Sequence, residues 1–186
     1  MKRIALLVLA VIAFSGHAFA QASAQASSDA IAKALQAAPA KVHDDAGVIV
    51  WKSDFTYDTL RKSNNGIVCY DITHRTVRQP FFIECTSMAN LPRVAQNLKF
   101  EASGDKVKAQ ALLDAAEKDG TRVKPEYGSV WYHYMGPDEA HAFHHMTIAV
   151  PGATTQSTGL PDNPKQGGVW IMNAGTSTAH LMTPGE

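Results

Sequence analysis

Histidine and methionine concentrate in the last third of the chain, and both side chains bind soft metal ions. His144 and Met146 lie two residues apart in one apolar segment, and His180 and Met182 repeat this spacing near the C-terminus. Residues two apart on a strand share a face, so each pair presents an imidazole beside a thioether. If the two segments are neighbouring strands, two nitrogens and two sulfurs converge. This set of ligands suits copper, above all Cu(I), with zinc as the other metal to consider.

His145 leaves the choice of ligand open. Adjacent residues of a strand point to opposite faces, so His144 and His145 cannot both serve one site. The hypothesis is therefore a metal site built from His180, Met182 and one of His144 or His145. The alternative is that the methionines fill gaps in the core and the histidines are hydrogen-bonded or solvated.

Motifs of the familiar enzyme classes are absent from the sequence. It contains no Gly-x-Ser-x-Gly elbow, P-loop, dinucleotide-binding fingerprint or His-Glu-x-x-His pattern. An aromatic segment with Trp131, Tyr132 and Tyr134 could line a ligand-binding face, although aromatic residues on strands more often belong to the core. If the protein is an enzyme, its active site is built around histidines that are not part of a recognisable sequence motif.

The first 20 residues have the pattern of a signal peptide. Lys2 and Arg3 precede an apolar run at 4–14, and Ala18 and Ala20 supply the small residues read by a signal peptidase. The run is well short of the roughly 20 residues that span a bilayer. We expect cleavage after Ala20 and a periplasmic or secreted protein without a membrane span in its mature form.

Charge and cysteine content fit an exported protein. The chain has 17 basic and 17 acidic side chains, and no clustered basic surface of the kind that binds nucleic acid is visible. Cys69 and Cys85 are the only cysteines, and an even number in an exported chain predicts a disulfide. Such a bridge over this short separation would stabilise the fold by about 3 kcal/mol. A redox pair is disfavoured because there is no Cys-x-x-Cys.

Hydrophobic periodicity predicts a flexible leader at 21–27 followed by a single α+β domain at 28–186. Helices are expected from Ser28 to near Pro39, around 93–98, and over 105–118 with an apolar stripe that includes Leu112 and a left-handed end at Gly120. Strands are expected at 48–51, 55–59, 67–70, 81–83, 129–135, 144–150, 169–173 and 179–182. A long surface loop covers 151–168.

These elements favour an antiparallel sheet of six to eight strands with two or three helices packed on one face. The first four strands are interpreted as an antiparallel meander. In that meander the Asn65-Gly66 turn forms a hairpin between the strands at 55–59 and 67–70.

Several short motifs resemble those of a family of uncharacterised exported bacterial proteins. The motifs are Leu60-Arg61-Lys62, Asn65-Gly66-x-x-Cys69, Cys85, His145-Met146, Ala174-Gly175-Thr176 and Ala179-His180-Leu181-Met182. They are spread over most of the chain from about residue 31. Ile67 stands where the family has an aromatic residue, and Ser177-Thr178 where it has Pro-Tyr. The resemblance implies no activity, but it identifies His145 rather than His144 as the shared histidine.

We therefore expect an exported, non-catalytic protein that binds a small molecule or a partner of the cell envelope. A periplasmic copper-type metal-binding protein is the first alternative. An enzyme with an unrecognised histidine-based site is the second.

Overall fold

The computed structural model describes residues 24–183, and the chain divides into two compact units, Met1–Lys33 and Ala34–Glu186. The described part of the first unit, 24–33, is helical. This helix includes residues 24–27 of the predicted leader, so it begins before the expected start at Ser28. The predicted signal peptide, its cleavage site after Ala20 and the leader residues 21–23 lie outside the described residues.

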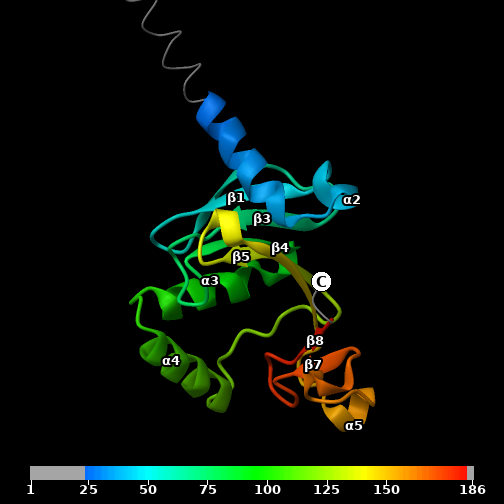
Figure 1. Cartoon of the computed structure of the whole chain (residues 1–186). Helices are drawn as coiled ribbons and strands as arrows, with labels where there is room; N and C mark the ends of the chain where they lie inside the picture. The colour runs from blue at the N-terminus through cyan, green and yellow to red at the C-terminus, as the bar shows by residue number, and fades with distance from the viewer. Residues whose placement is uncertain (1–23, 184–186) are drawn as a thin grey trace, which may run out of the picture. The chain divides into compact units, whose positions relative to one another are not determined.

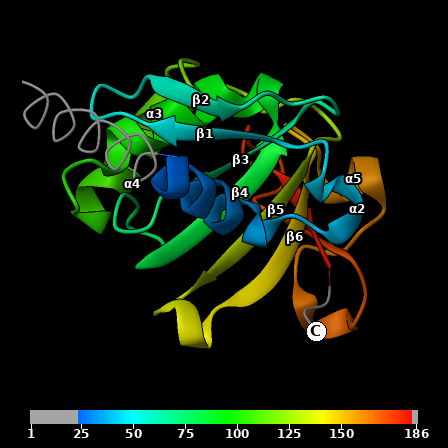
Figure 2. The same ribbon diagram turned by 90° about the horizontal axis from the view of Figure 1, so that it is seen from above.

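Eight strands of the larger unit form one sheet, which confirms the predicted α+β class. The strands are β1 (Gly47–Trp51), β2 (Tyr57–Arg61), β3 (Ile67–Asp71), β4 (Phe81–Ser87), β5 (Val130–Gly136), β6 (Phe143–Ala149), β7 (Trp170–Met172) and β8 (His180–Met182). Their order across the sheet is β2-β1-β3-β4-β5-β6-β8-β7, and Figure 2 shows the succession from β2 to β6. All neighbours are antiparallel except β1 and β3.

The helices of the larger unit are mostly short. They are α2 (Ala40–His43), α3 (Leu91–Glu101), α4 (Lys106–Lys118) and α5 (Thr155–Thr158), with single 3-10 turns η1 (Leu35–Ala37), η2 (Met88–Asn90), η3 (Glu139–His141) and η4 (Pro164–Gln166). The Asp105 side chain accepts hydrogen bonds from the first backbone N–H groups of α4, and Gly120 follows the helix with φ +70°. The expected apolar stripe of α4 is narrower than predicted, because Leu112 is 47 % exposed.

The main core lies between α3 and one face of the sheet (Figure 1). Leu91, Val94 and Leu98 recur on one side of α3 and pack against buried strand residues that include Tyr70 and Phe82. The opposite face of the sheet is covered by η1, whose Leu35 and Ala37 are buried. The prediction that the helical elements pack on one face was therefore wrong. The sheet has a hydrophobic surface on both sides, and both need cover.

The predicted antiparallel meander was wrong at its second connection, from β2 to β3, whereas β1 and β2 do pair antiparallel. β1 lies between β2 and β3 and runs parallel to β3, so the Asn65-Gly66 turn does not join two neighbouring strands. The 62–66 segment instead passes the start of β1, where the Asn64 N–H donates to the Asp45 carbonyl. Gly47 permits this crossing, because a Cβ at that position would lie 3.0 Å from the Ser63 backbone nitrogen.

The predicted disulfide is confirmed. Cys69 and Cys85 are directly opposite each other on β3 and β4, and both are completely buried on the face covered by η1. At the far end of the sheet, β7 and β8 pack on a separate small core around Ile171. Among residues 24–183, no helix is long and apolar enough to cross a membrane.

Candidate functional site

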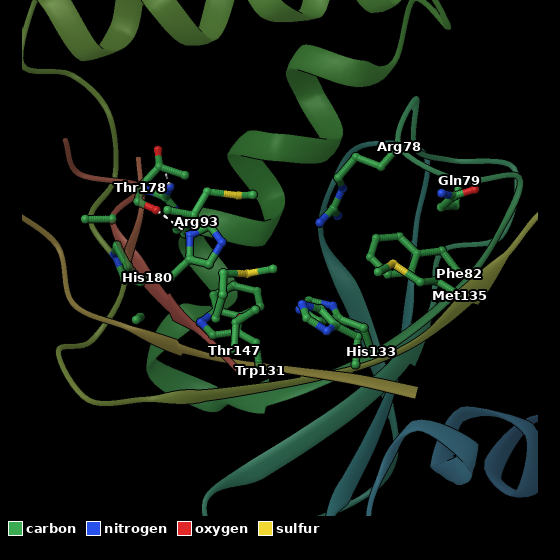
Figure 3. A pocket seen from close by; sticks show the side chains of 16 residues that line it. Arg78, Gln79, Phe82, Arg93, Trp131, His133, Met135, Thr147, Thr178 and His180 are labelled. Carbon is green, nitrogen blue, oxygen red and sulfur yellow. Dashed lines mark hydrogen bonds between the residues drawn. The ribbon is translucent and has the colours of Figure 1, made fainter. Parts of the chain in front are cut away.

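A cavity of about 390 Å³ lies between the start of α3 and the face of strands β4 to β8. Alternation along the strands places three imidazoles on this face, those of His133 on β5, His145 on β6 and His180 on β8. Figure 3 shows Thr178, Arg93 and His180 gathered at one end of the cavity, and Arg78 with Phe82 towards the other. The cavity therefore combines imidazoles and guanidinium groups with apolar walls.

The five predicted metal ligands do not share one face of the sheet. His145, His180 and Met182 line the cavity. His144 and Met146 alternate to the opposite face of β6, where the His144 ring stacks on Tyr134 with the ring centroids 4.6 Å apart. Only the ligand set that contains His145 remains possible for a single site.

Two cavity residues outside the predicted ligand set are cross-strand neighbours of the predicted ones. Met172 on β7 is directly opposite His180, and His133 on β5 is directly opposite His145. Both belong to the concentration of histidine and methionine visible in the sequence. Their positions depend on strand register, which no local motif specifies.

His180 has a fixed orientation. Its Nδ1–H donates a 2.7 Å hydrogen bond to the Thr178 carbonyl, so the neutral ring carries its lone pair on Nε2. Burial lowers the pKa of His180, and the neighbouring His133 and Arg93 add to this effect, although the hydrogen bond to the Thr178 carbonyl opposes it. Burial, together with His133 and His180, also lowers the pKa of His145. The lowered pKa values favour the neutral form of both rings.

Glu84 is a completely buried carboxylate that lies beside two residues lining the cavity, Arg78 and His133. Burial alone would raise its pKa, but Arg78, His133 and Tyr70 outweigh burial and lower the pKa to about 2. The Tyr70 hydroxyl donates a 2.5 Å hydrogen bond to Oε1. Oε2 lies 3.0 Å from His133 Nδ1 and 3.5 Å from Arg78 Nη1. Although they lie this close, Oε2 and His133 Nδ1 do not have the geometry of an aligned hydrogen bond.

His133 is packed between two rings. It stacks on Phe82 with a centroid distance of 5.5 Å and on His145 with a centroid distance of 6.0 Å. The Arg78 guanidinium lies 4.3 Å above the Phe82 ring. Arg78 also lies within ion-pair distance of Glu84 and Glu101, so its charge is balanced by protein carboxylates.

Arg93 is the second arginine of the cavity, and it is only 5 % exposed. Its guanidinium donates hydrogen bonds to the Val123 carbonyl and the Thr178 hydroxyl. Burial and the nearby Arg122 lower its pKa to about 10 against the opposing charge of Glu117, and this pKa leaves it cationic at neutral pH. No carboxylate of residues 24–183 lies within 4.0 Å of this guanidinium. Because an arginine has five N–H donors, part of its hydrogen-bonding capacity remains available at the cavity.

The remaining predicted features divide between the two faces. Trp131 lines the cavity, whereas Tyr132 and Tyr134 point to the other side of the sheet. Within the described part of the chain, no group of three or more His, Cys, Asp or Glu side chains is arranged to hold a metal ion. This finding does not bear on thioether ligands.

Comparisons of the chain with protein-family models, with curated proteins and with solved structures found no match. The functional interpretation therefore depends on the cavity itself.

Proposed function

We propose that this protein is an exported binding protein for a small organic anion, held in the cavity at the start of α3. The observation that carries the proposal is Arg93, a nearly buried guanidinium that has no carboxylate of residues 24–183 within ion-pair distance and is opposed only by the more distant charge of Glu117. Buried charges are normally paired, because an uncompensated ion in a low-dielectric environment is unfavourable. An anion in the cavity would provide the missing partner.

The walls of the cavity favour an apolar body for this ligand. Phe82, Trp131 and Met135 line one part of it, and Met172 and Met182 line another. The volume of about 390 Å³ falls within the range of roughly 300–1,000 Å³ typical of small-molecule sites. A carboxylate or sulfonate on an aromatic or aliphatic skeleton fits this combination of charge and surface.

Export supports the same interpretation but rests on other residues. The basic start, the short apolar run and the small residues at Ala18 and Ala20 have the pattern of a cleaved signal peptide. A buried disulfide is compatible with an oxidising compartment. When the chain is expressed with its own N-terminus in bacteria, the intact mass of the purified protein should correspond to a start at Gln21. A mass that retains residues 1–20 would contradict export by cleavage.

Anion binding is tested by calorimetric titration with two ligands of the same shape. We expect 2-naphthoate to bind at least tenfold more tightly than 2-naphthamide, because only the carboxylate pairs with Arg93. Arg93→Gln should abolish this difference. The matched control is Arg75→Gln, since Arg75 likewise donates two hydrogen bonds, to the Trp51 and Lys52 carbonyls, but lies outside the cavity.

Thr178→Val provides a second variant in case Arg93→Gln does not fold. It removes one hydrogen bond that orients the guanidinium and keeps the charge. Weaker naphthoate binding with unchanged naphthamide binding is expected. Equal affinity of the wild-type protein for the two ligands would overturn the proposal without any variant.

A further inference from the structure

Three soft ligands lie on one face of the last two strands. Met172 on β7 is directly opposite His180 on β8, and Met182 follows two residues later on the same face. Side chains directly opposite each other in an antiparallel pair have Cβ atoms about 5 Å apart. All three side chains line the cavity, whereas Ile171 between them is buried on the other face.

The partial exposure of these three side chains argues that they do not simply fill space in the core. Met172, His180 and Met182 are partly exposed, although the small core beneath β7 and β8 excludes solvent completely around Ile171. Methionines that only fill gaps would be expected inside that core. Here both methionine side chains line the cavity instead.

His180 is prepared to donate an electron pair. Its Nδ1–H is held by the Thr178 carbonyl at 2.7 Å, which leaves Nε2 without a proton. A backbone carbonyl on the far nitrogen is the arrangement that commonly orients histidine ligands of metals. His145 lines the same cavity from β6 and is the next imidazole available.

We propose that Met172, His180 and Met182 bind one Cu(I) ion through two thioether sulfurs and an imidazole nitrogen. Thioethers and imidazole select Cu(I) over harder ions. Zn²⁺ is not expected to bind tightly, because no group of three His, Cys, Asp or Glu is available to it within residues 24–183. None of the three ligands is Arg93, so the two proposals can fail separately although both sites lie in one cavity.

The test is an anaerobic titration in which the whole protein competes with bicinchoninate, a coloured chelator of Cu(I). The wild-type protein should withdraw one equivalent of Cu(I). Met172→Leu with Met182→Leu should weaken binding at least tenfold, since leucine keeps the volume and removes the sulfur. His180→Gln should weaken it to a similar degree. Met146→Leu and His144→Gln are the matched controls, because both residues lie on the opposite face of β6 and should have no effect.

The variants also separate this proposal from the first one. Arg93→Gln should still withdraw Cu(I), because Arg93 is not one of the three ligands, whereas it should lose the preference for 2-naphthoate over 2-naphthamide. X-ray absorption of the wild-type complex should show sulfur scatterers that the double methionine variant lacks. The proposal would be overturned if the wild-type protein withdrew no Cu(I), or if the double variant withdrew it as strongly as the wild type.

Discussion

Two buried ionic side chains of this protein differ in how closely their charges are paired. Glu84 has Arg78, His133 and Tyr70 around it, so its negative charge is balanced within the protein. Arg93 has hydrogen bonds to a carbonyl and a hydroxyl but no carboxylate within ion-pair distance in residues 24–183. The contrast indicates that Glu84 organises residues that line the cavity, whereas Arg93 is available to a ligand.

Replacement of Glu84 tests whether this buried carboxylate stabilises the fold around the cavity. Glu84→Gln removes the buried carboxylate that pairs with Arg78, and breaking a buried ion pair typically destabilises by about 3–5 kcal/mol. Urea denaturation should show a loss of this size. The exposed carboxylate of Glu139 provides a control, since Glu139→Gln should change the unfolding free energy by less than about 0.5 kcal/mol. Similar values for the two variants would contradict the role assigned to Glu84.

Part of the site could be predicted from individual residues. Period-two alternation correctly places His180 and Met182 on one face, and the family resemblance singles out His145, which lines the same cavity. Arg93 could not be found in this way, because its hydrogen-bond partner Thr178 lies 85 residues further along the chain. Long-range partners of this kind leave no local pattern in the sequence.

At the scale of elements, strand positions were predictable and strand neighbours were not. The branched and aromatic segments correspond to all eight strands, because period and composition are local properties. The position of β1 between β2 and β3 depends on the 62–66 crossing, which an Asn-Gly turn does not distinguish from a hairpin. The crossing depends in turn on the close approach of Gly47 and Ser63.

Gly47→Ala tests this crossing. The new Cβ would lie 3.0 Å from both the backbone nitrogen and the Cβ of Ser63. Because backbone must move to make room, we expect a loss of about 1–3 kcal/mol in unfolding free energy. Gly168→Ala is the matched control, since no atom lies within 4 Å of its Cβ and it should be nearly neutral. Equal stability of the two variants would show that the crossing tolerates a side chain.

For the whole molecule, stability should fall in two stages as the pH is lowered. The pKa values of His145 and His180 are lowered on folding, so the unfolded chain takes up protons first, near its ordinary value of 6.5. Stability is therefore complete above this pH and declines below it. Glu84 contributes fully above pH 4.5 and loses its contribution as the pH approaches about 2.

Urea midpoints measured from pH 8 to pH 3 check this profile. His180→Gln should reduce the decline just below pH 6.5, and Glu84→Gln should reduce the later decline below pH 4.5. A wild-type stability that stays constant between pH 7 and pH 4, or rises on acidification, would be inconsistent with these lowered pKa values.

The proposed function depends on contact between a bound anion and the Arg93 guanidinium. The most direct test is therefore to determine where an anion binds in the structure. A crystal structure with 4-bromobenzoate identifies the ligand by the anomalous signal of bromine. We predict bromine among the apolar walls near Trp131, and the carboxylate at about 2.8 Å from the Arg93 guanidinium. Bromine outside the cavity, or a carboxylate directed away from Arg93, would contradict the proposed function.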